Sequence, residues 1–317
     1  MSAFRERRYR VLALSAIILG ATAAFTQAQE PPSKPQPEAN NDLWLNWTDV
    51  EKNIWARAKP YLDYPLPELE SAVPELKGLE PAPSQEKLSL ILARVGDKCV
   101  NLLQRTPNVI SSEEVTTQAP QMRLSRQKFG YLLVSRQTPD GVVLAEYRTD
   151  TRGKPVGEGA WSGPISQGFA SMWVRLFPGN QPESKFRYLG QQEIDKHKTF
   201  VLAFAQVPDL VQFPAEFLLQ DTRISVLYQG VAWVDSSDFR IVRMREDLLA
   251  PRPDAYLKKF TAQIRFDEVQ IPKAASLLWL PREAVVEWEF KGQFVQQRHV
   301  YSHYRLYAVK TKILPAE

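Results

Sequence analysis

From residue 113 onward the sequence alternates between apolar and polar residues with a period of two, and this pattern limits the fold to one dominated by β-strands. Turn sequences separate successive segments, such as Pro-Asp-Gly at 139–141 and Lys-Gly-Gln at 291–293, and further turns are expected at 195–197 and 235–238. Turns of this kind indicate antiparallel hairpins. The predicted strands are 113–117, 121–127, 130–136, 142–148, 186–194, 199–206, 224–234, 240–248, 260–269, 279–290 and 294–310.

The lengths of the last two predicted strands indicate that the sheet is curved. They run for about twelve and seventeen residues, against the usual five or six, and long twisted antiparallel strands tend to curl toward a barrel. Two helices are expected beside them: 84–103, which opens with an N-cap serine, and 165–177, which shows one apolar face. The predicted fold class is therefore α+β, a long antiparallel curved sheet (half-barrel) with helices packed on its concave face.

The first 28 residues have the form of a secretory signal peptide. Four arginines precede an uncharged, mostly apolar run from Val11 to Phe25, and the small residues Thr26 and Ala28 follow it. The run of about fifteen residues is short for a helix that crosses a bilayer core of about 30 Å. We therefore expect cleavage near Ala28, export to the periplasm or secretion, and a mature chain without a transmembrane anchor.

Residues 29–84 are predicted to form a disordered, Pro-rich arm ahead of an antiparallel β domain at 85–317. Apolar residues at near-helical spacing indicate one short amphipathic helix within 43–58. Prolines recur over 60–83, and because proline removes a backbone donor and fixes φ, that part is expected to be extended. It is interpreted either as a spacer or as an arm that docks a partner. Its leucines could also lie on the body, namely Leu66, Leu69 and Leu76.

Charge and cysteine content argue against nucleic-acid binding and against a disulfide-stabilised scaffold. The chain has a net charge of +4. Four arginines and one glutamate fall in the predicted signal peptide, so the remainder carries a net charge of about +1 with both signs interspersed, unlike a surface that binds phosphates. Cys99 is the only cysteine and lies in the apolar stripe of the helix expected at 84–103, so it is predicted to be a core residue.

The sequence contains no recognisable catalytic, cofactor or metal motif. None of the serines at 162, 166 and 171 lies in a Gly-x-Ser-x-Gly elbow, and the glycine-rich stretch 152–159 lacks the Lys-Ser/Thr ending of a phosphate loop. Glu113, Glu114 and the acidic residues of 283–289 are expected to be solvated. We therefore predict a protein that is not an enzyme and that binds no cofactor and no metal.

The last predicted strand carries a row of polar and aromatic residues. On a helix, His299 and His303 would form an i, i+4 metal pair, but the flanking valine and tyrosine residues favour a strand, on which the two lie about 13 Å apart. A partly exposed polar face is expected, with a row at the mouth of a cavity as the functional alternative. The row comprises His299, Tyr301, His303, Arg305 and Tyr307.

Large apolar side chains gather around the helix expected at 165–177. Some of them are predicted to line a ligand cavity, although an ordinary filled core is the simpler alternative. The Pro-punctuated apolar segment 207–219 is expected to be a loop or short helix that acts as a lid over the cavity or plugs it. The candidate ligand-binding residues are Phe169, Met172, Trp173, Phe177, Phe204, Phe213, Phe217 and Trp233.

Several stretches resemble strands and turns of periplasmic lipoprotein-carrier-like proteins of bacteria. The resemblance covers roughly residues 187–309 and contains no active site. It rests on Arg-Tyr-Leu-Gly-Gln-Gln-Glu-Ile-Asp at 187–195 with Thr-Phe-Val-Leu-Ala-Phe at 199–204, on Gly-Val-Ala-Trp-Val-Asp at 230–235 with Phe-Arg-Ile-Val-Arg at 239–243, and on Trp-Leu-Pro at 279–281 with Tyr-Ser-His-Tyr-Arg at 301–305.

The resemblance implies an unclosed barrel wrapped around helices, with an apolar cavity that accepts acyl chains in the carriers and senses lipoproteins in a related envelope-stress regulator. This chain departs from the carriers in its Pro-rich arm, its greater length and the Lys-His pair at 196–197, where glycine is usual. We expect an exported, non-catalytic protein that binds a lipid, an acylated ligand or an envelope protein. The alternatives are an envelope interaction module with a filled core that docks partners through its arm, and a hydrolase whose site is assembled from distant residues.

Overall fold

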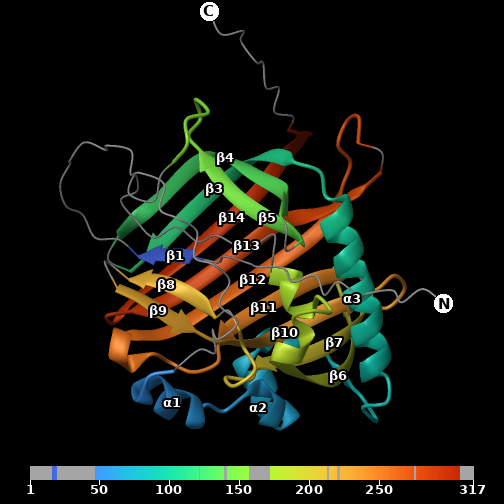
Figure 1. Cartoon of the computed structure of the whole chain (residues 1–317), viewed down its shortest axis with the longest axis vertical. Coiled ribbons are helices and arrows are strands. Elements are labelled where there is room, and N and C mark those ends of the chain that lie inside the picture. Colours follow the sequence, from blue (N-terminus) through green and yellow to red (C-terminus); the bar gives the residue numbers. More distant parts are fainter. Residues whose placement is uncertain are drawn as a thin grey trace, which may run out of the picture.

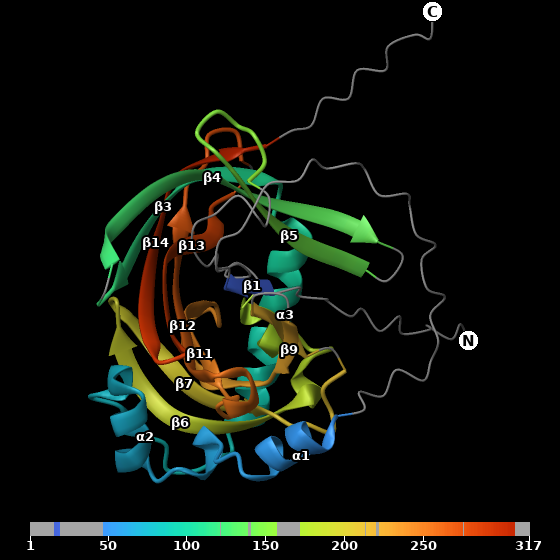
Figure 2. The same ribbon diagram turned by 90° about the vertical axis from the view of Figure 1, so that its left-hand side faces the viewer.

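The structure, a computed structural model, describes residues 16–19, 47–120, 122–138, 141–156, 172–212, 214–219, 222–274 and 276–307. Within them the chain forms one antiparallel sheet of 11 strands and a separate sheet of 3 strands (Figure 1). The large sheet curves strongly and its two end strands do not pair with each other, so it is a half-barrel (Figure 2). The predicted α+β class with a curved antiparallel sheet is confirmed.

The strands of the large sheet are mostly consecutive hairpins. In spatial order they are β2 (Glu80–Pro81), β6 (Ser184–Ile194), β7 (His197–Gln206), β10 (Tyr228–Asp235), β11 (Ile241–Leu248), β12 (Leu257–Val269), β13 (Leu278–Phe290), β14 (Gln293–Leu306), β3 (Val109–Ala119), β4 (Met122–Thr138) and β5 (Gly141–Thr149). The expected turns between β6 and β7, β10 and β11, and β13 and β14 are confirmed. One long-range pairing, that of β14 with β3, joins the last strand to an early one and completes the curve.

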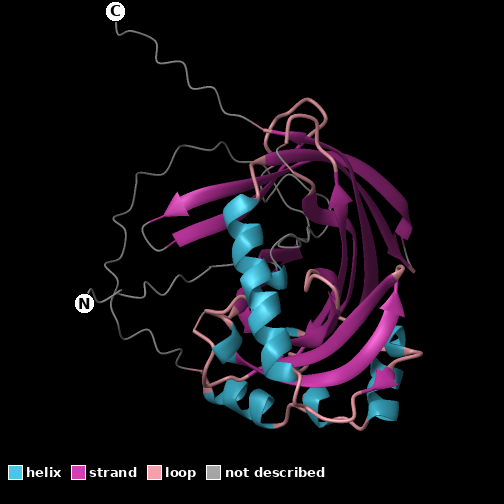
Figure 3. Ribbon diagram, turned by 90° about the vertical axis from the view of Figure 1, so that its right-hand side faces the viewer, coloured by secondary structure: helices cyan, strands magenta, loops and turns pink. Residues whose placement is uncertain are grey.

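The concave side of the half-barrel is covered by elements outside the large sheet. They are α3 (Leu88–Arg105), the 3₁₀ segment η3 (Met172–Leu176), and a small sheet of β8 (Ala215–Leu219), β9 (Thr222–Val226) and β1 (Ala16–Leu19). Figure 3 shows α3 running across the open side of the half-barrel. β1 pairs in parallel with β8. It lies within the predicted signal peptide, so cleavage near Ala28 would remove it and leave that edge of β8 unpaired.

Helix α3 forms where the apolar stripe predicted it. Its buried residues recur at the spacing of one helix face and include Ile91, Val95 and Cys99, which confirms Cys99 as a core residue. The helix begins at Leu88 rather than after Ser84 because residues 85–87 form a turn, in which the Ser84 hydroxyl accepts a bond from the Glu86 backbone. No helix among the described residues is long and apolar enough to span a membrane.

The arm from residue 47 to residue 84 is packed on the convex face and is not extended as predicted. It forms α1 (Asp49–Ala56), η1 (Tyr61–Asp63), α2 (Leu66–Ala72) and η2 (Pro74–Leu76), which lie outside the curve of β6 and β7 (Figure 2). Proline is tolerated in the first turn of a helix, and both α2 and η2 use it there. Leu69 and Leu76 are completely buried against the sheet, as their expected contact with the body implied, while Leu66 is partly buried. Two short 3₁₀ segments lie elsewhere, η4 (Gln181–Glu183) and η5 (Pro253–Ala255).

Four predicted segments differ from the structure or lie partly outside its described residues. The segments 121–127 and 130–136 join into the single strand β4, in which Gly130 lies so close to Thr149 of β5 that an added Cβ would stand 2.4 Å from its hydroxyl oxygen. The segment 224–234 is divided at Leu227 into β9 and β10, which belong to different sheets. Most of the predicted helix 165–177 lies outside the described residues, and its described part is the 3₁₀ segment η3.

Candidate ligand-binding face

The concave face carries one continuous apolar cluster, to which five of the predicted ligand-binding residues belong. The strands of the large sheet contribute the side chains on one side of this cluster, and the covering elements α3, η3, β8 and β9 contribute those on the other side. All five side chains are less than a tenth exposed. They come from η3 and the residue after it, from β7 and from β8, and are Met172, Trp173, Phe177, Phe204 and Phe217.

Phe217 shows how the small sheet contacts the large one. Its ring meets the ring of Phe260 on β12 edge to face, with 4.9 Å between centroids. The segment 207–219 was expected to be a loop or short helix, but its end is the strand β8, which begins just after Pro214. β8 and β9 pair with each other and not with the large sheet, so side-chain packing holds them on the concave face.

The 3₁₀ segment η3 is anchored at both of its sides. The Cys99 thiol of α3 donates to the backbone oxygen of Trp173 at 3.7 Å. Arg175 Nε donates to Oε1 of Glu246 on β11 at 3.1 Å, and its guanidinium lies 5.2 Å from the ring centre of Tyr228. Burial raises the pKa of Glu246, an effect that the charge of Arg175 opposes. These contacts hold Trp173 against the concave cluster.

Trp233 does not lie with the other candidate residues. It is completely buried on the convex face, packed with Leu69 and Leu76 of the arm, and its indole nitrogen donates to Oε1 of Gln192 at 2.7 Å. Successive residues of a strand point to opposite faces, so its neighbours Ala232 and Val234 belong to the concave cluster instead. The expectation that Trp233 surrounds the inserted helix is wrong. Two other candidates, Phe169 and Phe213, lie outside the described residues.

A buried charged cluster on the concave face was missed by sequence reasoning. Arg148 of β5 donates from Nη2 to Oε1 of Glu113 on β3 at 2.7 Å, and from Nε to the second carboxylate oxygen. His299 Nδ1 of β14 lies 2.8 Å from Oε1 of Glu113. Glu113 is only 1% exposed, so its predicted solvation is wrong, whereas Glu114 on the other face of β3 pairs with Arg126 near the surface.

The environment of this cluster sets its protonation. Burial alone would raise the pKa of Glu113, but the charge and hydrogen bonds of Arg148, with the hydrogen bond from His299, lower it to about 2. Burial lowers the pKa of His299, against the opposing effect of Glu113. At neutral pH Glu113 is therefore ionised, Arg148 balances its charge and His299 is neutral.

The predicted row on β14 is interrupted by a β-bulge. The register with β3 shifts between Ser302 and Arg305, and His303 takes a positive φ of 56°. His299 and Tyr301 therefore face the concave side, His303 is exposed, and Tyr304 turns inward, where its hydroxyl donates to the oxygen of Pro281 at 2.6 Å. The two histidines share no ligand position, and the described part of the chain holds no group of three or more residues suited to a metal ion.

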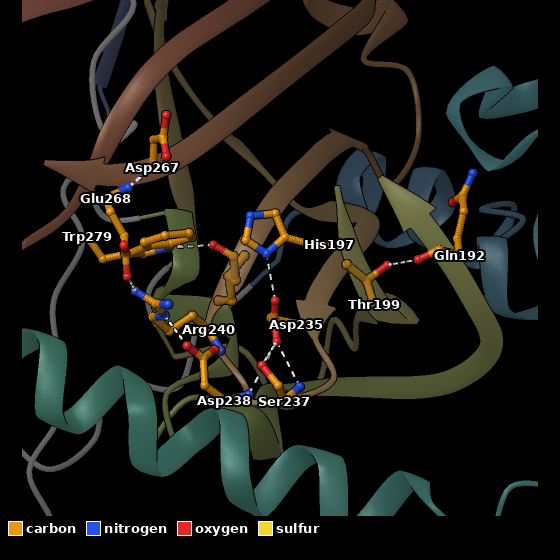
Figure 4. Close-up of polar contacts among 11 residues, drawn as sticks. Gln192, His197, Thr199, Asp235, Ser237, Asp238, Arg240, Asp267, Glu268 and Trp279 are labelled. Atoms are coloured by element: carbon orange, nitrogen blue, oxygen red, sulfur yellow. Dashed lines mark hydrogen bonds and ion pairs between the residues drawn. The ribbon is translucent and has the colours of Figure 1, made fainter. Parts of the chain in front are cut away.

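A second polar cluster lies near the ends of β7 and β10 (Figure 4). Asp235 lies 2.7 Å from Nδ1 of His197 and accepts from the Ser237 backbone nitrogen, also at 2.7 Å, and from the Ser237 hydroxyl. The aspartate thus stands between the histidine and the serine, whereas a hydrolase triad needs the histidine beside the serine. At the edge of this cluster the guanidinium of Arg240 lies 4.3 Å from the ring centre of Trp279. This arrangement stabilises the turn and activates no nucleophile.

No family model and no curated protein matches the chain. Among solved structures it is similar to a LolA superfamily protein from Nitrosomonas europaea, at 14% identity and a TM-score of 0.35, covering 69% of this chain and 94% of that one. A DUF1329 family protein from Desulfovibrio piger is similar at 12% identity and a TM-score of 0.36, covering 68% and 92%. A chain of the MucA/MucB complex of Pseudomonas aeruginosa is similar at 11% identity and a TM-score of 0.20, covering 68% and 99%.

Proposed function

We propose that this chain is an exported, non-catalytic binding protein of the bacterial cell envelope that holds an apolar or lipid-modified ligand against its concave face. The observation that carries the proposal is the way this face is covered. A curved sheet presents a broad apolar surface, and the cover consists of a helix, a 3₁₀ segment and a small sheet, none of which pairs with the large sheet through its backbone.

This construction suits ligand binding because the sheet and its cover depend on different interactions. Ladder hydrogen bonds between neighbouring strands hold the large sheet together. The cover is attached by apolar contacts, by the buried ion pair of Arg175 with Glu246, and by a hydrogen bond that Arg252 donates to the Ser225 backbone oxygen of β9. An acyl chain could replace side-chain contacts beneath the cover at little cost to the sheet, since one apolar contact takes the place of another.

The competing function, docking of partners through the N-terminal arm, has less support. The leucines of the arm that would make an apolar docking surface, Leu69 and Leu76, are already buried against the convex face of the same chain. Gln192 and Arg187 further tie the arm down by donating to its backbone oxygens. A partner would have to displace these contacts before it could use the same side chains.

Native mass spectrometry of the mature protein, purified without detergent from the periplasm of a Gram-negative host, tests the proposal. Solvent extraction then identifies any bound molecule, and titration with phospholipid or an acylated peptide follows. A copurified or added acyl compound of defined mass is the expected result. A clean protein mass that stays unchanged with both probes would overturn the proposal.

Trp173→Ala and Trp233→Ala are a matched pair for this experiment. Both side chains are almost completely buried, so both substitutions remove the same volume from a packed core and destabilise by about 3–5 kcal/mol. Only Trp173 lies on the concave face. We expect Trp173→Ala to weaken ligand binding and Trp233→Ala to leave it unchanged; equal loss in both variants would show that binding follows overall stability and not the concave face.

A further inference from the structure

We propose that the hydroxyls of Tyr131, Tyr301 and Ser111 form a site on the concave face that donates hydrogen bonds to an uncharged carbonyl, such as that of an acyl ester. This inference rests on the proposed function and adds the chemistry of the ligand's polar end.

The register of four strands brings these residues together. Ser111 of β3 lies opposite Tyr131 of β4, and Tyr131 in turn lies opposite Arg148 of β5. Two residues farther along β3, Glu113 lies opposite Tyr301 of β14. The rings of Tyr131 and Tyr301 are in contact, with 4.9 Å between their centroids. Residues from four strands thus converge on one part of the concave face.

The three hydroxyls are buried and have no hydrogen-bond partner among the described residues. Tyr131 is 1% exposed, Ser111 2% and Tyr301 5%. Glu146 approaches Tyr131, and Tyr304 approaches Ser111, but neither contact reaches hydrogen-bond geometry. A buried hydroxyl without a partner is costly, and native proteins keep few of them, so three in one place point to a ligand group that completes their bonding.

The charges around the hydroxyls favour an uncharged ligand group. Glu113 and Arg148 neutralise each other in a two-bond ion pair, and His299 is neutral, so this cluster of described residues leaves no unbalanced positive charge to attract a phosphate or carboxylate. An anionic headgroup would therefore lose its hydration without gaining a counter-charge.

The hydroxyls can serve as donors, and the surface beside them is apolar. Burial raises the pKa values of Tyr131 and Tyr301 well above their ordinary range, so both phenols keep their protons. Both residues belong to the same apolar cluster as Trp173 and Phe217. A carbonyl bound by the hydroxyls would therefore leave its hydrocarbon chain on the concave face, which is the arrangement that an acyl ester needs.

The experiment compares dioctanoylglycerol with its dioctyl ether analogue, which has the same chains but no carbonyls. Binding of each to the full chain is measured by native mass spectrometry and calorimetry. We expect the wild type to bind the ester about 25-fold more tightly than the ether, since each of two net hydrogen bonds contributes about fivefold in affinity. The double variant Tyr131→Phe/Tyr301→Phe should lose most of the preference for the ester, because it lacks both phenol donors and keeps only the Ser111 hydroxyl.

Tyr188→Phe is the control, because Tyr188 lies in the same apolar cluster but on β6, toward the other end of the sheet. Tyr188→Phe should retain the full preference for the ester over the ether. Ser111→Ala is a second test variant, and it should reduce that preference by less than the double tyrosine variant does. Equal binding of ester and ether by the wild type would overturn this inference and leave the proposed function standing. No binding of either compound would overturn both.

Discussion

Removal of Arg148 is the sharpest test of the buried charged cluster. In Arg148→Met the hydrocarbon part of the side chain is largely kept, while the carboxylate of Glu113 loses both of its bonds to the guanidinium. Glu113 is only 1% exposed, so water cannot replace those bonds. Among the residues that the structure describes, its remaining partner is His299, whose imidazole is neutral at pH 7.

The expected loss of stability at pH 7 is about 3–5 kcal/mol, the usual cost of leaving one partner of a buried ion pair uncompensated. The pKa of Glu113 gives a similar magnitude. It falls from 4.5 to about 2 in the folded protein, and a shift of that size corresponds to about 3 kcal/mol of preference for the ionised form. The matched surface variant Arg282→Met breaks an exposed pair with Asp267 and should cost under about 1 kcal/mol.

Urea unfolding at pH 7 and pH 5 measures the loss of stability in Arg148→Met and in Arg282→Met. The stability gap between the wild type and Arg148→Met should narrow at pH 5, because a proton on Glu113 or His299 removes the unbalanced charge. In Glu113→Gln/Arg148→Met the loss should be smaller than in Arg148→Met alone. A loss under about 1 kcal/mol in Arg148→Met, or a gap that widens at pH 5, would refute the reasoning.

Three further predictions concern the core, the pH dependence and the single thiol. Trp233→Ala should lower the free energy of unfolding by about 3–5 kcal/mol and speed proteolysis of residues 61–79, whose buried apolar side chains share its cluster; unchanged proteolysis would contradict the packing. The folded-state pKa values of His299 and Glu113 both lie below their ordinary values, so the unfolded chain binds more protons in acid. Wild-type stability in urea should therefore fall first below about pH 6.5 and again between about pH 4.5 and 2; in His299→Gln the first step should vanish, and its persistence would assign it to another group. Burial raises the pKa of Cys99, so its thiol should react with a maleimide only in denaturant, and fast labelling of the native protein would show that α3 does not cover it.

The parts of the fold that depend on local sequence could be predicted. Period-two alternation and hairpin turns gave the order of most strands, and the apolar stripe around Cys99 gave α3. Apolar spacing predicted α1, but α2 and η2 could not be read from the prolines of the arm, because proline breaks a helix interior but is accepted in its first turn. The strand β8 was missed because it is only 5 residues long and most of its partner, β9, was predicted as part of the single longer segment 224–234.

The site was harder to predict because it depends on pairing between distant strands. Alternation shows that Trp233 and Ala232 face opposite sides of β10, but only the assembled sheet shows which side is concave. Glu113 looked like a surface residue because its partners, Arg148 and His299, stand 35 and 186 residues away in sequence. A bulge of one extra residue at His303 then reversed the faces of the end of β14.

Photo-crosslinking with a monoacylglycerol that carries a diazirine on its acyl chain tests most directly whether the concave face holds the ligand. Labelled peptides from the full chain are identified by mass spectrometry, with an excess of unlabelled monoacylglycerol as the competitor. Competable labelling of η3 and β8, around Trp173 and Phe217, is the predicted result. Labelling confined to the convex face and the arm, or labelling that the competitor does not reduce, would contradict it.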